Sequence, residues 1–291
     1  MDSRYRSSGS PASFSYNLPG GSVEIPADTV CVLDSFICHN TFKTVQDWNR
    51  RVYFREVASG GGVTDRWAEL PLANHNVFSL AIAVGAALNS ATSFSSGVLG
   101  GNVDPPYACI YDNTTGEIRI TLKTIYDGSA PPVQANIGTS FKIWSREELQ
   151  TTSDWTGTGG FALDITALHD ASEIIGNVSG SLALASVGSL ASMPEFPDIN
   201  PIKQIFVHSK TLGHRSSLGP SGETTIIRRV PCISNYGETI FDNLSQLADH
   251  FEIGGSQLSQ IDFELRDSNG RLVPLTRHCS FSLLMVPLEY F

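Results

Sequence analysis

The amino-acid sequence predicts an all-β fold made of many short strands. Charged residues account for 16% of the chain, well below the share of about 25% that is typical of globular proteins. The chain also contains 26 Gly and 15 Pro, which favour tight turns between short strands over long, salt-bridged helices. Two segments near the end of the sequence alternate apolar and polar side chains, and this alternation is typical of strands with one buried face.

The first part of the chain, residues 13–57, is predicted to form consecutive short strands. β-branched and aromatic residues fill its apolar segments, which are separated by the turn residues Pro19-Gly20-Gly21 and Pro26-Ala27-Asp28. The apolar segments contain Phe14 and Tyr16, then Val23 and Ile25, then residues 30–33, then residues 52–54.

One amphipathic helix is expected near residues 76–90. Its apolar residues recur at spacings of three and four: Val77, Leu80, Ala81, Val84 and Leu88. Asn74 or Asn76 can cap its first turn. Such an apolar stripe is expected to lie against a sheet rather than to bind a cofactor.

Two β-hairpins are predicted from strand-like segments on both sides of a turn. In the first, residues 107–111 and 117–122 flank a turn that ends at Gly116. In the second, two alternating segments flank the turn Asp267-Ser268-Asn269-Gly270. We expect the apolar residues of this second hairpin to lie in the core, where each contributes about 1.5–3 kcal/mol of transfer free energy. They are Ile261, Phe263, Leu265, Phe281, Leu283 and Met285.

Residues 146–200 interrupt the strand pattern and are predicted to be an insertion or a linker. Their apolar density is low, and prolines cluster at their end. Short helices are possible near residues 146–149 and 167–175. The glycine-rich run 157–160 is predicted to be flexible linker, because it lacks the Lys-Ser/Thr of a phosphate-binding loop and no apolar strand precedes it.

Charge and hydropathy exclude two classes of partner. With 19 Lys and Arg against 29 Asp and Glu, the chain has a formal net charge of -10 and a pI of about 5.1, so its surface is expected to repel phosphate backbones. The longest stretch without a charged residue, 70–103, is apolar only between residues 77 and 88, which is too short for membrane insertion. Residues 1–11 lack the apolar core of a secretory signal, so we expect the protein to fold in a reducing compartment.

The sequence has no pattern typical of an enzyme or a metal site. Its seven histidines have no metal-binding spacing, and no Gly-x-Ser-x-Gly nucleophile motif occurs. The five cysteines include no Cys-x-x-Cys pair and are expected to be buried apolar residues. Three Asn-x-Ser/Thr sequons, at Asn113, Asn177 and Asn243, are expected to be chance matches. We therefore predict no catalytic residue, no cofactor and no metal ion.

The first residues of the chain, 1–12, are polar and are predicted to form a flexible N-terminal arm. Arg4, Tyr5 and Arg6 make a small basic region within it. Such an arm can dock on a neighbouring subunit or on packaged nucleic acid. Any contact with nucleic acid is expected to be restricted to this arm.

Two blocks of the sequence carry a resemblance to a known family. The first block begins at Asp2-Ser3-Arg4-Tyr5-Arg6 and ends with residues 25–34, IPADTVCVLD. The second block contains residues 205–209 (IFVHS), 227–231 (IRRVP), 261–270 (IDFELRDSNG) and 280–282 (SFS). Together they resemble the minor capsid, or penton, proteins of polinton-like viruses and virophages, which are small double-stranded DNA viruses of protists. The resemblance covers about half of the chain and is weaker between residues 58 and 200.

The resemblance implies a jelly-roll β-sandwich with a long insertion and one or two short helices. A jelly roll has eight strands in two sheets. Residues 13–145, including the helix, would supply the first part of the sandwich and residues 201–291 the second part, with residues 146–200 as the insertion.

The resemblance also implies a viral structural protein, a subunit that forms homopentamers at the fivefold vertices of an icosahedral shell. Its partners would be copies of itself and a double jelly-roll major capsid protein, to which spike or cement proteins could be added. The protein would then be located in the virion, assembled inside the host cell and not secreted. No residue of such a subunit needs to be catalytic.

Two other functions fit parts of the sequence. A β-sandwich module for receptor or glycan binding, such as an attachment spike, would use the loop 208–223, with Trp48, Trp67 or Trp155 stacking on a sugar. An exposed aromatic platform beside Asp or Asn would favour this alternative, and buried tryptophans would not. An enzyme with a cupin-like barrel would need a His-x-His metal pair, which the sequence lacks.

Overall fold

The computed structural model shows a chain that consists mainly of β-strands. It describes residues 1–94, 96–99, 102–125, 138–152, 154–155, 169–179, 184–213, 222–243 and 250–290. In these ranges the strands are accompanied by one helix of four turns and a few much shorter helices. The predicted all-β fold class is confirmed.

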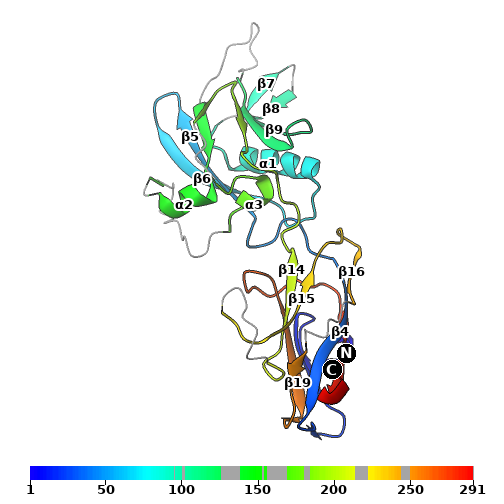
Figure 1. The fold of residues 1–291 in the computed structure, drawn as a ribbon. Coiled ribbons are helices and arrows are strands. Elements are labelled where there is room, and N and C mark those ends of the chain that lie inside the picture. Colours follow the sequence, from blue (N-terminus) through cyan, green and yellow to red (C-terminus); the bar gives the residue numbers. More distant parts are fainter. Residues whose placement is uncertain are drawn as a thin grey trace. The chain divides into compact units, whose positions relative to one another are not determined.

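The chain forms two compact units (Figure 1). Unit 1 comprises Met1–Phe42 and Ile202–Phe291, and unit 2 comprises Lys43–Pro201. The division at residues 201 and 202 lies within one residue of the predicted start of the second sandwich part. The other division differs from the prediction, because the strands between residues 43 and 145 belong to unit 2 and not to the sandwich of the chain ends.

Hydrogen bonding explains why residues 146–200 do not form a separate insertion. Within this range, β12 (Ala185–Ser186) pairs with β11 (Gly138–Ile143), and β13 (Leu190–Ser192) pairs with β10 (Glu117–Leu122). The segment therefore completes both sheets of unit 2. The short helices possible near 146–149 and 167–175 correspond to α2 (Arg146–Thr151) and α3 (Ser172–Ile175), whereas residues 157–160 lie outside the described residues.

Unit 1 contains two facing sheets and one small pair of strands. The first sheet has the order β1 (Ser8–Gly9), β2 (Ser13–Asn17), β19 (Gln260–Arg266), β14 (Gln204–His208) and β15 (Ile226–Pro231). In the second sheet, β4 (Thr29–His39) pairs with β16 (Thr239–Asp242) and β17 (Phe251–Glu252), and with β20 (Cys279–Pro287) along its other side. The small pair is β3 (Val23–Glu24) with β18 (Gln257–Leu258).

Four phenylalanine rings join the two sheets of unit 1. Phe14 and Phe263 come from the first sheet, and Phe36 and Phe281 come from the second. The Phe263 and Phe281 rings meet edge to face with 4.7 Å between their centroids, and Phe14 lies 5.5 Å from Phe263. All four side chains are buried. Two sheets that meet through such a core are consistent with the predicted jelly-roll sandwich.

The predicted second hairpin does not form, because β19 pairs with β2 and β14 in the first sheet and β20 pairs with β4 in the second. The six side chains predicted for its core fall into two groups. Ile261, Phe263, Leu265 and Phe281 are buried, whereas Leu283 is half-buried and Met285 is 37% exposed. The pairing of β20 with β4 has a bulge at Ser282 and Leu283, and β20 is an edge strand. The alternating burial of β20 therefore ends at the bulge, and the residues that follow lie at the sheet edge and stay accessible to solvent.

Unit 2 is a second two-sheet sandwich. One sheet has the order β12, β11, β5 (Arg51–Ala58) and β6 (Val63–Glu69), and the other has the order β13, β10 and β9 (Tyr107–Asp112). A two-stranded hairpin, β7 (Gly97–Leu99) with β8 (Asn102–Asp104), precedes β9. The predicted hairpin of residues 107–122 is thus the β9–β10 pair, in register from Tyr107 opposite Leu122 to Asp112 opposite Glu117.

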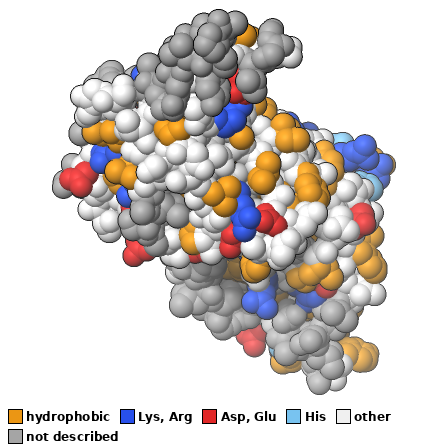
Figure 2. Space-filling model, turned by 90° about the horizontal axis from the view of Figure 1, so that it is seen from above, with side chains coloured by type: hydrophobic (Ala, Val, Ile, Leu, Met, Phe, Trp, Pro, Cys, Tyr) orange, Lys and Arg blue, Asp and Glu red, His pale blue; other side chains and the backbone are white. Residues whose placement is uncertain are grey.

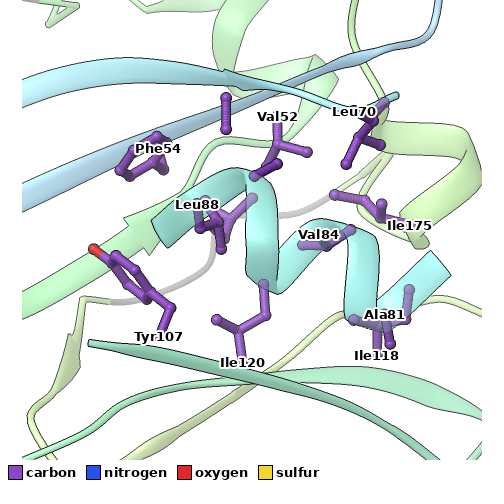
Figure 3. Close-up of a cluster of buried hydrophobic side chains, with 14 of the residues drawn as sticks. Val52, Phe54, Leu70, Ala81, Val84, Leu88, Tyr107, Ile118, Ile120 and Ile175 are labelled. Carbon is purple, nitrogen blue, oxygen red and sulfur yellow. The ribbon is translucent and has the colours of Figure 1, made fainter. Parts of the chain in front are cut away.

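Helix α1 (Val77–Ala91) closes one side of the unit 2 sandwich. Asn76 caps it, because its side chain accepts a hydrogen bond from the backbone N–H of Ser79 at 2.9 Å. The helix contacts β6 and β9, which are the edge strands of the two sheets on this side. Figure 3 shows Leu88, Val84 and Ala81 between side chains of both sheets.

Two features fix α1 against β9. A Cβ added to Gly85 would come within 3.2 Å of the Cys109 side chain, so the helix backbone approaches the strand closely here. The amide of Asn89 donates to the backbone oxygen of Tyr107 at 2.9 Å and accepts from its N–H at 2.8 Å. Asn89 therefore acts as the missing strand partner for this part of the β9 edge.

Replacing Phe263 by Asn should unfold unit 1. Loss of a buried Phe side chain costs about 3–5 kcal/mol, and an unpartnered amide in the core adds to this cost. We expect the cooperative thermal transition of unit 1, followed by circular dichroism, to disappear or to shift to much lower temperature. The matched control is Tyr290→Asn, since Tyr290 is exposed. A Phe263→Asn protein that melts like the parent would contradict the core described here.

Replacing Asn89 by Ala should lower the free energy of unfolding of unit 2 by about 1–3 kcal/mol, because both backbone groups of buried Tyr107 lose their partner. Chemical denaturation measures this difference. Ser90→Ala, at the next and exposed position of the helix, is the control and should leave stability unchanged. Equal stability of both variants would show that the Asn89 contacts are dispensable.

Candidate assembly surfaces

The N-terminal segment lies along the edge of β20 in unit 1. The backbone N–H of Phe281 donates to the oxygen of Met1 at 2.8 Å, and Asp2 forms a bridge with Ser280. Ser3 is buried, and its hydroxyl accepts from the N–H of Cys279 at 3.0 Å. The short 3₁₀ helix η1 (Ser3–Tyr5) and strand β1, paired with β2, complete the segment.

The predicted flexible arm therefore differs from the structure, in which residues 1–12 pack on unit 1. The physical reason is backbone hydrogen bonding. The polar side chains of this segment do not indicate burial, but the segment forms hydrogen bonds with the backbone groups at the edges of β20 and β2. Of the three basic-region residues, only Arg4 and Tyr5 are exposed. Arg6 is half-buried and donates to the backbone oxygens of Ser3 and Gly9 at 2.7 and 2.8 Å.

Arg4 is engaged by its own segment. Its guanidinium forms an ion pair with Asp2 at 2.6 Å and lies over the Tyr5 ring, 5.8 Å from the centroid. The hydrogen bond from Arg4 holds the pKa of the Asp2 carboxyl below its usual value. The positive charge of Arg4 is thus partly neutralised, which weakens the predicted contact with nucleic acid.

Beyond Phe281, the edge of β20 is open among the described residues. Both backbone groups of Phe281 point away from β4 to Met1, so those of Leu283 and Met285 also point outward. Leu284 and Met285 are exposed, as are Leu288 and Tyr290 in the 3₁₀ helix η3 (Leu288–Tyr290) that follows. Such an edge can accept a further strand.

Trp67 and Trp155, two of the three tryptophans proposed for glycan stacking, lie against other side chains. Trp155 meets Tyr53 and Trp144 edge to face, with 5.6 and 6.3 Å between ring centroids, and Trp67 packs in the same cluster. Trp155 and Trp67 are half-buried, as is Trp48. These tryptophans do not form the exposed platform that a sugar-binding site would require.

Trp144, at the centre of this cluster, is held by charged neighbours. Its indole N–H donates to the buried carboxylate of Asp65 at 3.0 Å. Arg55 binds the same carboxylate through two nitrogens at 2.8 Å and lies over the Trp144 ring, 4.6 Å from the centroid. The charges therefore stabilise the fold rather than form a site for a ligand.

The predicted binding loop at residues 208–223 is described only in part. His208 is buried at its start, where its Nδ1 lies 2.9 Å from the Thr225 hydroxyl. Burial, together with the charge of Arg266, lowers the pKa of His208. Residues 214–221, including His214, lie outside the described residues. Over the described ranges, no three His, Cys, Asp or Glu side chains are placed to hold a metal ion.

The cysteine side chains are buried or half-buried. Burial raises the pKa of the Cys31, Cys109 and Cys232 thiols to about 12 and that of Cys279 to about 11. All five cysteines have free thiols. These thiols are therefore neutral at physiological pH and behave as apolar side chains, as the sequence indicated.

The buried carboxylate of Glu56 is fully used by hydrogen bonds. It accepts from the backbone N–H and hydroxyl of Ser93 at 3.0 and 2.7 Å, from the Tyr107 hydroxyl at 2.9 Å, and from the Thr92 hydroxyl. Burial and the Glu56 charge raise the pKa of Tyr107 well above its usual value. Glu56 thus anchors the chain that follows α1 and has no lone pair directed at a substrate.

One apolar surface was not anticipated from the sequence. Phe78, Ile82 and Ala86 follow one another at spacings of four along α1 and are exposed, on the side opposite the core residues. Phe78 also contacts Tyr111 of β9 edge to face, with 5.2 Å between centroids. We call these three residues the outward face of α1. The signal for it was present in the sequence, because the helix lacks any charged residue to place toward solvent.

The opposite side of unit 2 is closed by the chain between β12 and β13. The N–H of Val187 donates to the oxygen of Thr139 at 3.0 Å, and that of Gly188 donates to Leu122 at 2.8 Å, so this turn links the two sheets. Gly188 has a φ of 79°, which favours glycine. Leu184 and Leu190 flank the turn and are exposed. We call this side the β12–β13 edge.

The described residues thus define an all-β protein of two sandwich units. The sequence matches no protein family model and no curated protein. Solved structures that are similar to this chain include two from virophages. The crystal structure of the selenomethionine-labelled mavirus penton protein is 10% identical, with a TM-score of 0.48, over 97% of this chain and 92% of that one. A chain of the Sputnik virophage structure from electron cryo-microscopy is 13% identical, with a TM-score of 0.44, over 98% of this chain and 94% of that one.

The structure has no helix in its described part that is long and apolar enough to cross a membrane.

Removal of residues 2–9 should destabilise unit 1 rather than merely shorten an arm. The deletion removes the hydrogen bonds of Ser3 with Cys279, Tyr16 with Asp2, and Ser7 with Ser15, each worth about 1 kcal/mol. We expect a lower denaturation midpoint in urea. Arg4→Ala, which removes the ion pair with Asp2 and the contact with the Tyr5 ring but no backbone hydrogen bond to the strands, should match the parent. An unchanged midpoint after the deletion would mean that the segment contributes nothing to folding.

Proposed function

We propose that this protein is a structural subunit of a viral capsid that forms homopentamers at the fivefold vertices. One observation carries the proposal: the two sequence blocks that resemble penton and minor capsid proteins come together in unit 1. The first block supplies β2 and residues 29–34 of β4. The second block supplies β14, β15, β19 and the start of β20. These strands pair directly with one another, so the resemblance coincides with one folded unit.

The surface supports this proposal. Large apolar side chains are exposed on both units, and only 16% of the residues are charged. On the face seen in Figure 2, orange hydrophobic side chains are spread more widely than red or blue charged ones. Large exposed apolar patches mark contacts with other molecules, and charged residues are depleted at the centres of such contacts.

The proposed partners follow from this role. They are copies of the chain itself, a double jelly-roll major capsid protein, and spike or cement proteins at the exposed loops. Contact with nucleic acid is restricted to the region of Arg4 and Tyr5, and the net charge of -10 keeps it weak. The protein acts in the virion and is assembled inside the host cell. Within this proposal the protein needs neither catalysis nor a cofactor.

The oligomeric state tests the proposal. Size-exclusion chromatography with light scattering of the purified chain should give a mass of about 157 kDa, five times the mass of the 31.4 kDa chain. Negative-stain images should show rings with fivefold symmetry. A protein that remains monomeric over the whole soluble concentration range, or that forms rings of another number, would contradict the pentamer.

A further inference from the structure

The outward face of α1 is not explained by the folding of unit 2. A helix that is apolar all round is normally buried on all sides. The inner side of α1 is buried in the core through Leu80, Val84 and Leu88, yet Phe78 and Ile82 are 50% and 68% exposed. Closing the edges of β6 and β9 uses the inner side, together with the ring contact of Phe78 with Tyr111, and leaves at least half of Phe78 and of Ile82 uncovered. The outward face is therefore available for a contact with another molecule.

The chemistry of this face favours a second copy of the chain as its partner. The stretch 70–103 contains no Asp, Glu, Lys or Arg, whereas the chain as a whole has a net charge of -10. Two copies repel each other through their net charge, so a close contact between them is favoured where both surfaces are free of charge. A helix that binds membrane surfaces would carry Lys or Arg on its polar side, and α1 has neither.

A closed ring of identical subunits needs two different faces on each copy. Contacts in such a ring are heterologous, because one face of a subunit meets another face of the next. The sheet orders of unit 2 place β6 and β9, with α1, at one end and β12 with β13 at the other. The second end also exposes apolar side chains, Leu184 and Leu190. Unit 2 thus has two lateral faces that are both apolar and are different from each other.

We propose that neighbouring copies contact each other through the outward face of α1 on one copy and the β12–β13 edge on the next. This inference rests on the proposed homopentamer and specifies its interface. A stable interface buries about 800 Å² on each partner, with apolar residues at its centre and polar ones around them. Phe78 and Ile82 form the centre on one side, and Leu184 and Leu190 form it on the other.

Charge substitutions on the two faces, alone and mixed, test the pairing. Ile82→Glu and Leu190→Glu should each convert the pentamer to monomers in light scattering. An equimolar mixture of the two variants should give a complex of two chains and nothing larger, because only one intact pair of faces remains. Ile233→Glu, at an almost fully exposed position of unit 1, is the matched control and should stay pentameric.

The outcomes separate this interface from the proposed function. If the parent is a pentamer and Ile82→Glu or Leu190→Glu remains one, the interface is wrong and the capsid role stands. If the mixture assembles beyond two chains, or does not associate, the pairing of these two faces is wrong. If the parent is monomeric, the homopentamer itself fails.

Cross-linking provides a measurement that does not depend on disrupting the fold. A chain with both Ala86→Cys and Leu190→Cys, treated with a bismaleimide, should give covalent species of up to five copies on a denaturing gel. The native cysteines are largely buried and serve as the background in the parent. Each single variant should stay uncoupled. Efficient coupling of Ala86→Cys alone would show that α1 meets α1, which overturns the proposed arrangement.

Discussion

The backbone groups at the edges of the sheets are the constraint on which the rest of this structure depends. An edge strand has outer N–H and C=O groups that must find a partner or remain in water. In unit 2, α1 covers the edges of β6 and β9, and the turn between β12 and β13 links the opposite edges. In unit 1, Met1 and Ser3 pair with the first residues of β20. The positions of α1, of the β12–β13 turn and of the N-terminal residues are thus explained by the strand edges that they cover.

The need to cover strand edges also shows which surfaces of α1 are required for folding and which surfaces are not required for it. The contact of Gly85 with Cys109 and the hydrogen bonds of Asn89 with Tyr107 attach α1 to the edge of β9. Phe78 adds a ring contact with Tyr111 of β9, but it stays 50% exposed, and this attachment does not require Ile82 to be apolar. Apolar side chains that folding does not use, on a chain with so few charges, indicate contacts between molecules.

Local sequence patterns predicted the elements for which side-chain periodicity alone is decisive. The helix expected near residues 76–90 is observed at Val77–Ala91, and the alternating segments form β10 and β19. Which strands share a core depends on pairing across long distances in the sequence, and no local pattern contains this information. The strands β12 and β13 were missed because segments of two or three residues are too short to show a period.

The candidate surfaces were predictable to a smaller extent. Arg4, Tyr5 and Arg6 were recognised by their charge, but the docking of their segment depends on backbone hydrogen bonds, which leave no trace in side-chain composition. The exposure of Met285 follows from its position on an edge strand, which sequence alternation does not reveal. The outward face of α1 could have been found from the lack of charges between residues 70 and 103.

In the sequence, unit 2 lies between the two segments of unit 1, and this order has a consequence for synthesis on the ribosome. Unit 2 is continuous in sequence, so all its strands can pair once residue 201 has emerged. Strand β4 must wait for β20, since Thr29 pairs with Pro287 and Cys38 with Cys279. Unit 1, which consists of two segments of the sequence, therefore acquires its native contacts late and at a high cost in loop-closure entropy. Until β20 has been synthesised, the side of the apolar strand Thr29–His39 that pairs with it has no partner strand, and folding proceeds outward from the middle of the polypeptide.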